Sequence, residues 1–93
     1  MQLRHIRYFI ALAEELHFTR AAARLYIEQP PLSRAIKELE ESLGVVLFNR
    51  DRRGTRLTAD GVAFLQDARR LFRMLDQAEQ NVKAVAAGLR GNL

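Results

Sequence analysis

The segment from Gln29 to Leu43, QPPLSRAIKELEESL, has two faces of opposite character at helical spacing. Its apolar residues recur at steps of four, three and four, which predicts one continuous apolar stripe along a helix. They are Leu32, Ile36, Leu39 and Leu43. The opposite face contains Pro30, Ser33, Arg34 and Lys37, with Gln29 just before them. Such a helix must pack on a core through one face, and it leaves hydroxyl, guanidinium, ammonium and amide groups on the other.

The length of the chain limits that core to one domain. With 93 residues and no Trp, the chain can build one modest core from aliphatic and Phe side chains, and it is too short for two. The absence of cysteine excludes disulfides and thiolate metal sites, and it fits a reducing cytosol. The first residues, MQLRHIRYF, carry charges without a long apolar run. We therefore expect neither a signal peptide nor a membrane span, and a cytoplasmic protein.

The distribution of charge favours a polyanionic partner more than the total does. The net charge is +4, from fifteen Lys and Arg against eleven Asp and Glu. Four arginines lie between Arg50 and Arg56 with a single acid, Asp51, whereas three glutamates lie between Glu38 and Glu41. A unit with one basic end and one acidic end fits a molecule that meets nucleic acid from one side.

Two shorter helices are predicted before this segment. A regular apolar pattern indicates the first helix, over residues 1–16, and its apolar positions are Leu3, Ile6, Phe9, Ile10, Ala13 and Leu16. Thr19 is the expected N-cap of the second, which runs to about Tyr26. That helix holds three alanines at 21–23. They reflect either helix propensity or the close crossing that a helix-turn-helix requires.

The residues around and after the central segment predict where it stops and a hairpin begins. Pro30 and Pro31 fit the first helical turn, and Gly44 fits a C-terminal cap. Two short strands are then expected, over 45–48 and 56–58, with the turn in NRDRRGT and Gly54 near its tip. A hairpin this short needs the helical core as a neighbour.

A long final helix is predicted from a cap at Thr58, with Asp60 in its first turn, to about Ala87. Its apolar residues alternate at steps of four and three, the spacing of a coiled-coil seam that pairs with a second copy. The seam comprises Phe64, Ala68, Leu71, Leu75, Ala78, Val82, Val85 and Leu89, and Met74 is interpreted as core filling within the seam. The tail GLRGNL, beginning at Gly88, is interpreted as the exit from the helix.

The order of these elements and three sequence stretches resemble one known family. The stretches are LRHIRYFIALAEE, FTRAAARLYIEQPPLSRAIKELEESLGVVLFNR and RGTRLTADG. They resemble the N-terminal DNA-binding region of LysR-type transcriptional regulators over nearly the whole chain. The resemblance implies a mainly α winged helix-turn-helix domain over 1–58, made of three helices and a two-stranded wing. Its helix-turn-helix motif covers about 18–37.

The resemblance also implies assembly and a missing part. The helix over 59–87 would be the dimerisation helix of a homodimer, which could form a tetramer in the full-length protein. Residues 88–93 would begin a C-terminal ligand-sensing domain that lies outside this chain. The seam residues Phe64, Ala68, Leu71, Leu75, Ala78, Val82 and Val85 are the expected dimer contacts. Two residues depart from the family pattern: Glu28 stands where Ser or Ala is common, and Asp51 adds an acid to the wing.

Base-reading roles are expected at the start of the central helix, where the resemblance places recognition. Gln29 can pair with adenine edges, Arg34 with guanine O6 and N7, and Ser33 with either. Pro30 and Pro31 can contact a thymine methyl group. Double-stranded DNA is thus the expected partner.

Phosphate contacts are expected around these base readers. Lys37 either contacts phosphate or pairs with Glu41. Thr19 can cap its helix, bring helix amides to a phosphate, or do both. The arginines of the hairpin are either a solvated turn or, as the resemblance favours, a wing on the DNA backbone or minor groove; they are Arg50, Arg52 and Arg53, with Arg53 at the tip. Glu40 matches the family's LExxLG pattern and is expected to be structural.

Catalysis and metal binding find little support in the sequence. The two histidines, His5 and His17, lie on different turns, and Asp60 and Asp67 have no nucleophile or phosphate loop beside them. We expect no enzyme, no cofactor and no metal. The alternative from another class is a helical module that dimerises and binds protein, which salt-sensitive binding to duplex DNA would separate from a DNA-binding domain.

Overall fold

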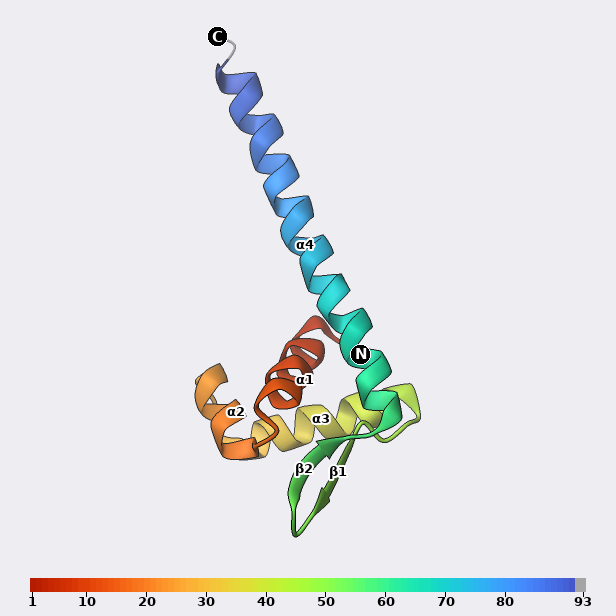
Figure 1. The fold of residues 1–93 in the computed structure, drawn as a ribbon. Coiled ribbons are helices and arrows are strands. Elements are labelled where there is room, and N and C mark those ends of the chain that lie inside the picture. The colour runs from red at the N-terminus through yellow and green to blue at the C-terminus, as the bar shows by residue number, and fades with distance from the viewer. Residues whose placement is uncertain (92–93) are drawn as a thin grey trace.

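The computed structural model describes residues 1–91, and their side chains as far as residue 88. The elements in chain order are α1 (Leu3–Glu15), α2 (Phe18–Leu25), α3 (Gln29–Leu43), β1 (Phe48–Asp51), β2 (Gly54–Leu57) and α4 (Ala59–Gly91). The first three helices pack together, the two antiparallel strands project from them, and α4 rises away on the other side (Figure 1). The predicted mainly α, winged helix-turn-helix architecture with a long last helix is confirmed.

The core lies where α1, α3 and the start of α4 meet. Its largest fully buried side chains are Phe9, Leu12, Leu32, Leu39 and Leu47. The apolar stripe predicted on α3 is buried as expected, with Leu43 partly covered at its end. Each fully buried aliphatic or Phe side chain contributes about 1.5–3 kcal/mol to folding. The stripe therefore holds α3 firmly while its other face remains outside.

Aromatic contacts join the hairpin and the long helix to this core. The ring of Phe9 on α1 lies 5.0 Å from the ring of Phe64 on α4 and 5.4 Å from that of Phe48 on β1, measured between centroids. Tilted and edge-on pairs at this separation are favourable beyond the area they bury. One side chain of α1 thus sets the position of both the wing and the first turns of α4.

Two polar side chains, those of Glu40 and Thr58, fix the backbone around the wing. The Glu40 carboxylate of α3 accepts hydrogen bonds from the backbone N–H groups of Leu47 (2.7 Å) and Phe48 (3.3 Å), which confirms its structural role. The Thr58 hydroxyl accepts from Gly61 N at 3.0 Å, so Thr58 caps α4 as predicted. A Cβ at Gly61 would lie 2.2 Å from the carbonyl oxygen of Leu47, so α4 can approach the chain before β1 only with glycine there.

Several predicted boundaries are wrong, including that of the second strand, which begins at Gly54 and not at residue 56. The second helix begins at Phe18 because His17 is its N-cap, with Nδ1 accepting from Arg20 N at 3.2 Å, and Thr19 lies inside the first turn. The first strand begins at Phe48 because Glu40 holds the N–H groups of Leu47 and Phe48, so the segment 45–47 is not a strand. The long helix continues past Gly88 to Gly91, since Gly88 does not take the positive φ of a helix-ending cap.

An ion-pair cluster ties α4 to the helical domain. The Glu14 carboxylate of α1 lies 2.6 Å from Arg24 Nη2 on α2 and 2.9 Å from Arg69 Nη2 on α4. The hydrogen bond from Arg24, and after it the one from Arg69, lowers the pKa of Glu14. Arg24 also lies 3.4 Å from Glu15. Three helices therefore meet at one carboxylate near the base of the long helix.

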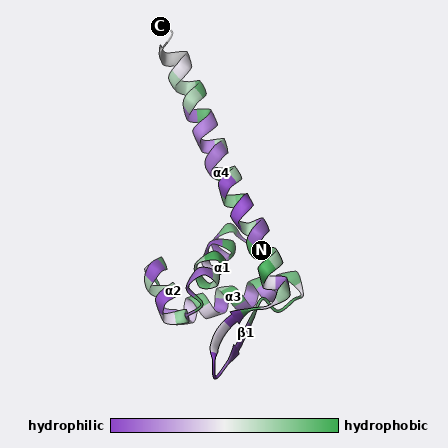
Figure 2. Cartoon of the chain, in the orientation of Figure 1, coloured by the Kyte–Doolittle hydropathy of each residue, from purple (hydrophilic) through white to green (hydrophobic). Residues whose placement is uncertain are grey.

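In the described part of the chain, residues 73–85 of α4 are exposed and lie beyond the domain. The molecule measures 63 × 25 × 20 Å because this helix extends far beyond the domain (Figure 1). Figure 2 shows hydrophilic residues over much of its length, interrupted by apolar ones. No helix within residues 1–91 is long and apolar enough to cross a membrane.

Candidate nucleic-acid interface

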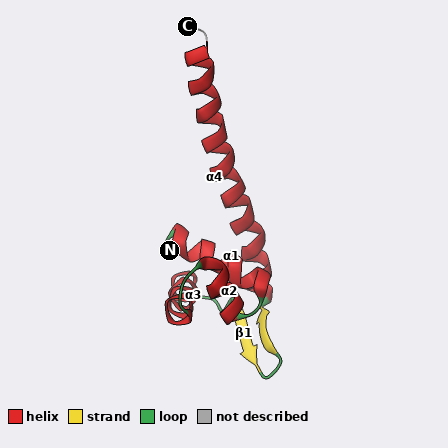
Figure 3. Cartoon of the chain, turned by 90° about the vertical axis from the view of Figure 1, so that its left-hand side faces the viewer, coloured by secondary structure: helices red, strands yellow, loops and turns green. Residues whose placement is uncertain are grey.

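Helix α3 lies at the end of the molecule opposite the C-terminus, next to the wing (Figures 1 and 3). Gln29, Pro30, Arg34 and Lys37 are exposed there, whereas Pro31 and Ser33 are partly covered. Helix α3 begins with a glutamine followed by two prolines, which lose no intrahelical hydrogen bond in the first turn. The sequence-predicted base readers therefore share one exposed surface.

The first turns of α2 and α3 are joined through two of the predicted contacts. Gln29 Nε2 donates a hydrogen bond to Thr19 Oγ1 at 2.8 Å. Both side chains are exposed, and Thr19 is not the N-cap that the sequence predicted. Its hydroxyl instead orients the amide of Gln29, a relationship between residues ten positions apart that neither helix pattern reveals.

A groove of about 400 Å³ separates α3 from the wing. Its lining residues are Ser33, Arg34, Ile36, Lys37, Glu40 and Arg50. The Arg50 guanidinium carbon lies 3.7 Å from the centroid of the Phe18 ring, so Arg50 is held against α2. Three cations line this groove with one carboxylate, that of Glu40, which already accepts two backbone hydrogen bonds.

Lys37 makes no ion pair with Glu41 within 4 Å in the described part of the chain. The pairing that the sequence left open is thus not formed. The exposed ammonium group points to no carboxylate partner and remains available to a ligand such as phosphate.

The wing presents two of its arginines at the tip and uses a third to build it. Arg52 and Arg53 are the two turn residues between the paired positions Asp51 and Gly54, and both are exposed. The Asp51 carboxylate accepts from Arg53 N at 2.8 Å and from Arg56 Nη2 at 2.5 Å. Gly54 has φ 108°, a conformation that side-chain-bearing residues rarely adopt. Asp51, which the sequence marked only as an extra acid, therefore shapes the turn.

The predicted seam on α4 divides into two parts. Leu71, Leu75, Ala78, Val82 and Val85 are exposed. Ala68 is 2% exposed and Phe64 packs on Phe9, so both serve the core of their own domain. The prediction that Ala68 lies in an intermolecular seam is wrong, because α4 turns this side toward α1. Met74 is 72% exposed, so it does not pack in the core of its own domain, and its place in the seam stays a prediction.

The two histidines hold structural positions. His17 caps α2, and the buried ring of His5 lies with Nε2 3.0 Å from the Glu38 carboxylate of α3. That contact misses the angle of a good hydrogen bond, and His5 has no hydrogen-bond partner within the described residues. Among these residues, no three His, Asp or Glu side chains gather as they do around a metal ion.

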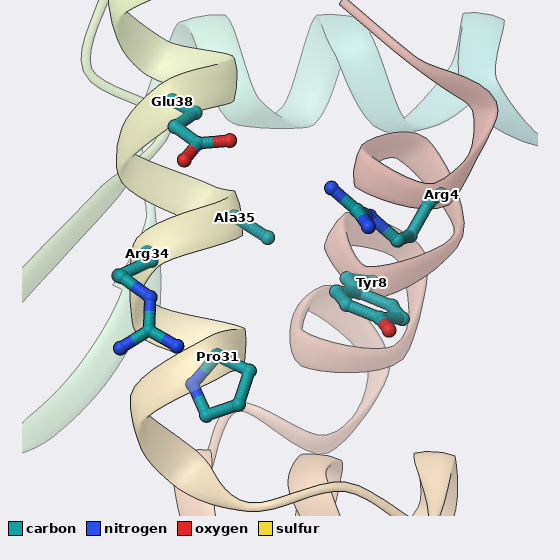
Figure 4. Close-up of a pocket in the computed structure, with 6 residues that line it drawn as sticks. All are labelled: Arg4, Tyr8, Pro31, Arg34, Ala35 and Glu38. Carbon is teal, nitrogen blue, oxygen red and sulfur yellow. The ribbon is translucent and has the colours of Figure 1, made fainter.

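Sequence reasoning missed one further surface beside α3. Arg4 and Tyr8 of α1 face α3 across a hollow of about 160 Å³ (Figure 4). The spacing of four places the two residues on one side of α1, which was the available signal. Nothing in the pattern of α1 alone shows which helix that side faces.

Comparison with known proteins identifies the family to which this sequence is similar. A family model described as bacterial regulatory helix-turn-helix protein, lysR family, matches residues 3–62. BudR, an HTH-type transcriptional regulator of Klebsiella aerogenes, is 52% identical over 93 residues, which cover 100% of this chain and 65% of BudR. The chain thus spans less than two thirds of this relative.

Solved structures share the fold over nearly the whole chain. The CbnR_DBD–DNA complex superposes with a TM-score of 0.88 at 45% identity and covers 92% of this chain and 99% of that chain. The BenM_DBD/benA site 1 DNA complex gives a TM-score of 0.90 at 48% identity, covering 95% and 99%. Because the family model spans residues 3–62 of the 93, the chain belongs to the lysR family of bacterial regulatory helix-turn-helix proteins.

Proposed function

We propose that this chain binds double-stranded DNA in a sequence-specific manner, as the DNA-binding part of a transcriptional regulator. The observation that carries the proposal is the exposed polar face of α3, which lies between a cationic groove and the wing. An α-helix fits the major groove of B-DNA, where side chains can distinguish all four base pairs. The similarity to CbnR_DBD and BenM_DBD, both solved with DNA, supports the same role here.

The proposed contacts divide into base readout and positioning. Gln29, Ser33 and Arg34 read base edges from the first turns of α3, with Pro30 and Pro31 against thymine methyl groups. Lys37 and Arg50 face the backbone of one strand from the groove between α3 and the wing. The positioning set also includes Thr19, Arg52 and Arg53, which contact phosphates and bring the wing tip to the minor groove.

We propose further that the second half of α4 pairs with a second copy of the chain. Val82 and Val85 are 65% and 62% exposed at heptad spacing on a helix that the domain does not cover. A two-fold dimer would present two copies of α3 to two half-sites on the DNA. Leu71, Leu75 and Ala78 complete this set of dimer contacts.

The remaining parts of the proposal concern the whole protein. The chain spans 31% of full-length CbnR, so a ligand-sensing domain is proposed to follow α4, beginning near residues 88–93. A tetramer is proposed for the full-length protein. A bacterial regulator of this kind would work in the cytoplasm, where the chromosome is, and it would have no catalytic activity of its own.

Binding to duplex DNA at several salt concentrations tests the proposal against the alternative of a protein-interaction module. Fluorescence anisotropy with a labelled random duplex should show affinity that falls steeply as salt rises, because each neutralised phosphate releases counterions. A helical module that binds only protein would show no such binding. Binding that is absent at low salt would contradict the proposed function.

A further inference from the structure

The hollow between α1 and α3 borders the base-reading face on the side away from the wing. Along α3 it is lined by Pro31, Arg34, Ala35 and Glu38, which share one helical stripe. The groove beside the wing uses the stripe of Ser33, Ile36, Lys37 and Glu40. At about 100° per residue these stripes lie on nearly opposite flanks of the helix. The base readers Gln29 and Ser33 lie toward the wing-side stripe, whereas Arg34 borders both the groove and the hollow.

This arrangement matters because the major groove has two walls. A helix with its side chains is roughly 10–12 Å across, close to the groove width of about 12 Å. A recognition helix therefore meets one phosphodiester backbone on each flank. Cations already face the wing-side flank, at Lys37 and Arg50. The flank of α3 away from the wing faces the other DNA strand, so any contact with its backbone must come from side chains of α1 beside that flank.

The side chains of α1 provide a cation and a hydroxyl at this place. Figure 4 shows Arg4 reaching from α1 toward α3 with Tyr8 beside it, and Glu38, Ala35 and Pro31 following one another along α3, with Arg34 on the edge of α3 farther from α1. Arg4 is exposed, and within the described residues neither Arg4 nor Arg34 has an ion-pair partner within 4 Å. Both guanidinium groups keep their donors for a ligand.

The hollow contains one carboxylate, that of Glu38, which lies next to a buried side chain. Glu38 Oε2 lies 3.0 Å from Nε2 of the buried His5. The hollow therefore offers two guanidinium groups and a phenol against one carboxylate that already faces a ring within the core. Guanidinium groups bind phosphate oxygens through two parallel hydrogen bonds, which makes phosphate the ligand chemistry that fits.

We propose that Arg4, with Tyr8, binds a backbone phosphate of the DNA strand on the α1 side of the recognition helix. This inference rests on the proposed DNA-binding function. It assigns a role in DNA binding to α1, which otherwise serves as core scaffold. The recognition helix is then held between two backbone contacts, one from the wing groove and one from α1.

The test is the salt dependence of binding by Arg4→Ala on a random duplex, with Arg7→Ala as the matched control. Arg7 lies on the same helix, but its guanidinium carbon lies over the Phe72 ring at 5.3 Å, away from this hollow. Loss of one phosphate contact should lower the slope of log K against log salt by about 0.9, which is roughly a 3.5-fold difference between about 50 and about 200 mM salt. Arg7→Ala should keep the wild-type slope.

A second variant tests the same hollow with the opposite sign. Glu38→Gln removes the carboxylate and should tighten binding to specific and random duplexes alike. Unfolding temperatures of all variants, compared with that of the wild type, identify any that are misfolded. Equal slopes for Arg4→Ala and Arg7→Ala, or weaker binding by a folded Glu38→Gln, would overturn this inference alone. A wild-type chain that binds no duplex at any salt concentration would overturn the proposed function as well.

Discussion

The side-chain amide nitrogen of Gln29 lies 2.8 Å from the hydroxyl oxygen of Thr19, across the turn that separates α2 from α3. This bond uses one of the two Nε2 hydrogens and leaves the second hydrogen and the amide oxygen for a base edge. Fixing an exposed glutamine before binding saves about 0.5–1.5 kcal/mol of side-chain ordering. Thr19 is thus expected to act through Gln29 as well as on a phosphate.

Thr19→Val tests this relationship, because it removes the hydroxyl and keeps the branched shape. We expect the preference for one base pair to fall by up to about 1 kcal/mol, because Gln29 must then be ordered on binding. Thr19→Ser keeps the hydroxyl and should restore the preference. The measurement is affinity for duplexes that differ only at that base pair. A loss for Thr19→Val that is the same on every duplex would instead assign Thr19 to phosphate alone.

Replacing Glu28 should raise both the stability of α3 and the affinity of the chain for DNA. It is the N-cap of α3, and its side chain makes no capping hydrogen bond. Glu28→Ser supplies a capping oxygen, worth about 0.5–2 kcal/mol, and removes a negative charge near the DNA. Thermal unfolding should shift upward, and binding should tighten on selected and random duplexes alike. If the selected duplex alone is bound more weakly, Glu28 accepts a hydrogen bond from a base.

The Glu14 cluster predicts a pH-dependent contribution to stability. The pKa of Glu14 is lowered in the folded chain by its bonds to Arg24 and Arg69. Its contribution is therefore present above the pKa of the unfolded chain and is lost as the pH falls through the lower folded value. Glu14→Gln should reduce the free energy of unfolding at neutral pH by roughly 0.2–1 kcal/mol for each partly exposed pair.

Chemical denaturation at several pH values checks this prediction. The difference between wild type and Glu14→Gln should shrink as the pH falls into the acid range. Glu79→Gln is the matched control, because among the described residues Glu79 pairs only with Lys83, one turn along α4, at 2.8 Å. A difference for Glu14→Gln that persists unchanged at low pH would show that lost packing, and not charge, accounts for it.

The exposed seam predicts a dimer that a single charge disrupts. Val82→Glu should give monomers that still fold, because the core lies in the first 72 residues and Val82 does not touch it. Gln80→Glu adds the same charge on another face of that turn and should leave the dimer intact. Sedimentation velocity gives the oligomeric state. An unchanged dimer for Val82→Glu would reject the seam.

Local rules predicted much of this fold because the relevant forces are local. The stripe of α3, the cap at Thr58 and the turn glycine Gly54 each follow from spacing or backbone conformation. The end of α4 does not, since a glycine lowers helix propensity without ending a helix. Ala68 was misassigned because a small apolar residue fits an internal core and an intermolecular seam equally well.

The candidate site was only partly predictable for a different reason. Exposure of Arg34 and Lys37 follows from the helical pattern of α3 alone. The contact of Arg50 with Phe18 depends on how the wing packs against α2. The position of Arg4 opposite α3 depends on how α1 and α3 pack together. Such relationships between distant segments come from tertiary packing, which no spacing along one element encodes.

The central claim is that α3 reads base sequence, and a ratio of two affinities tests it most directly. A duplex selected by the wild-type chain from a random library is compared with a scrambled duplex at one fixed salt concentration. We expect the wild type to prefer the selected duplex by about 10³-fold or more, and Arg34→Ala to lose about 1–3 kcal/mol on that duplex alone. Arg53→Ala should weaken both duplexes evenly. A wild-type ratio near one, or equal losses on both duplexes for Arg34→Ala, would contradict the account.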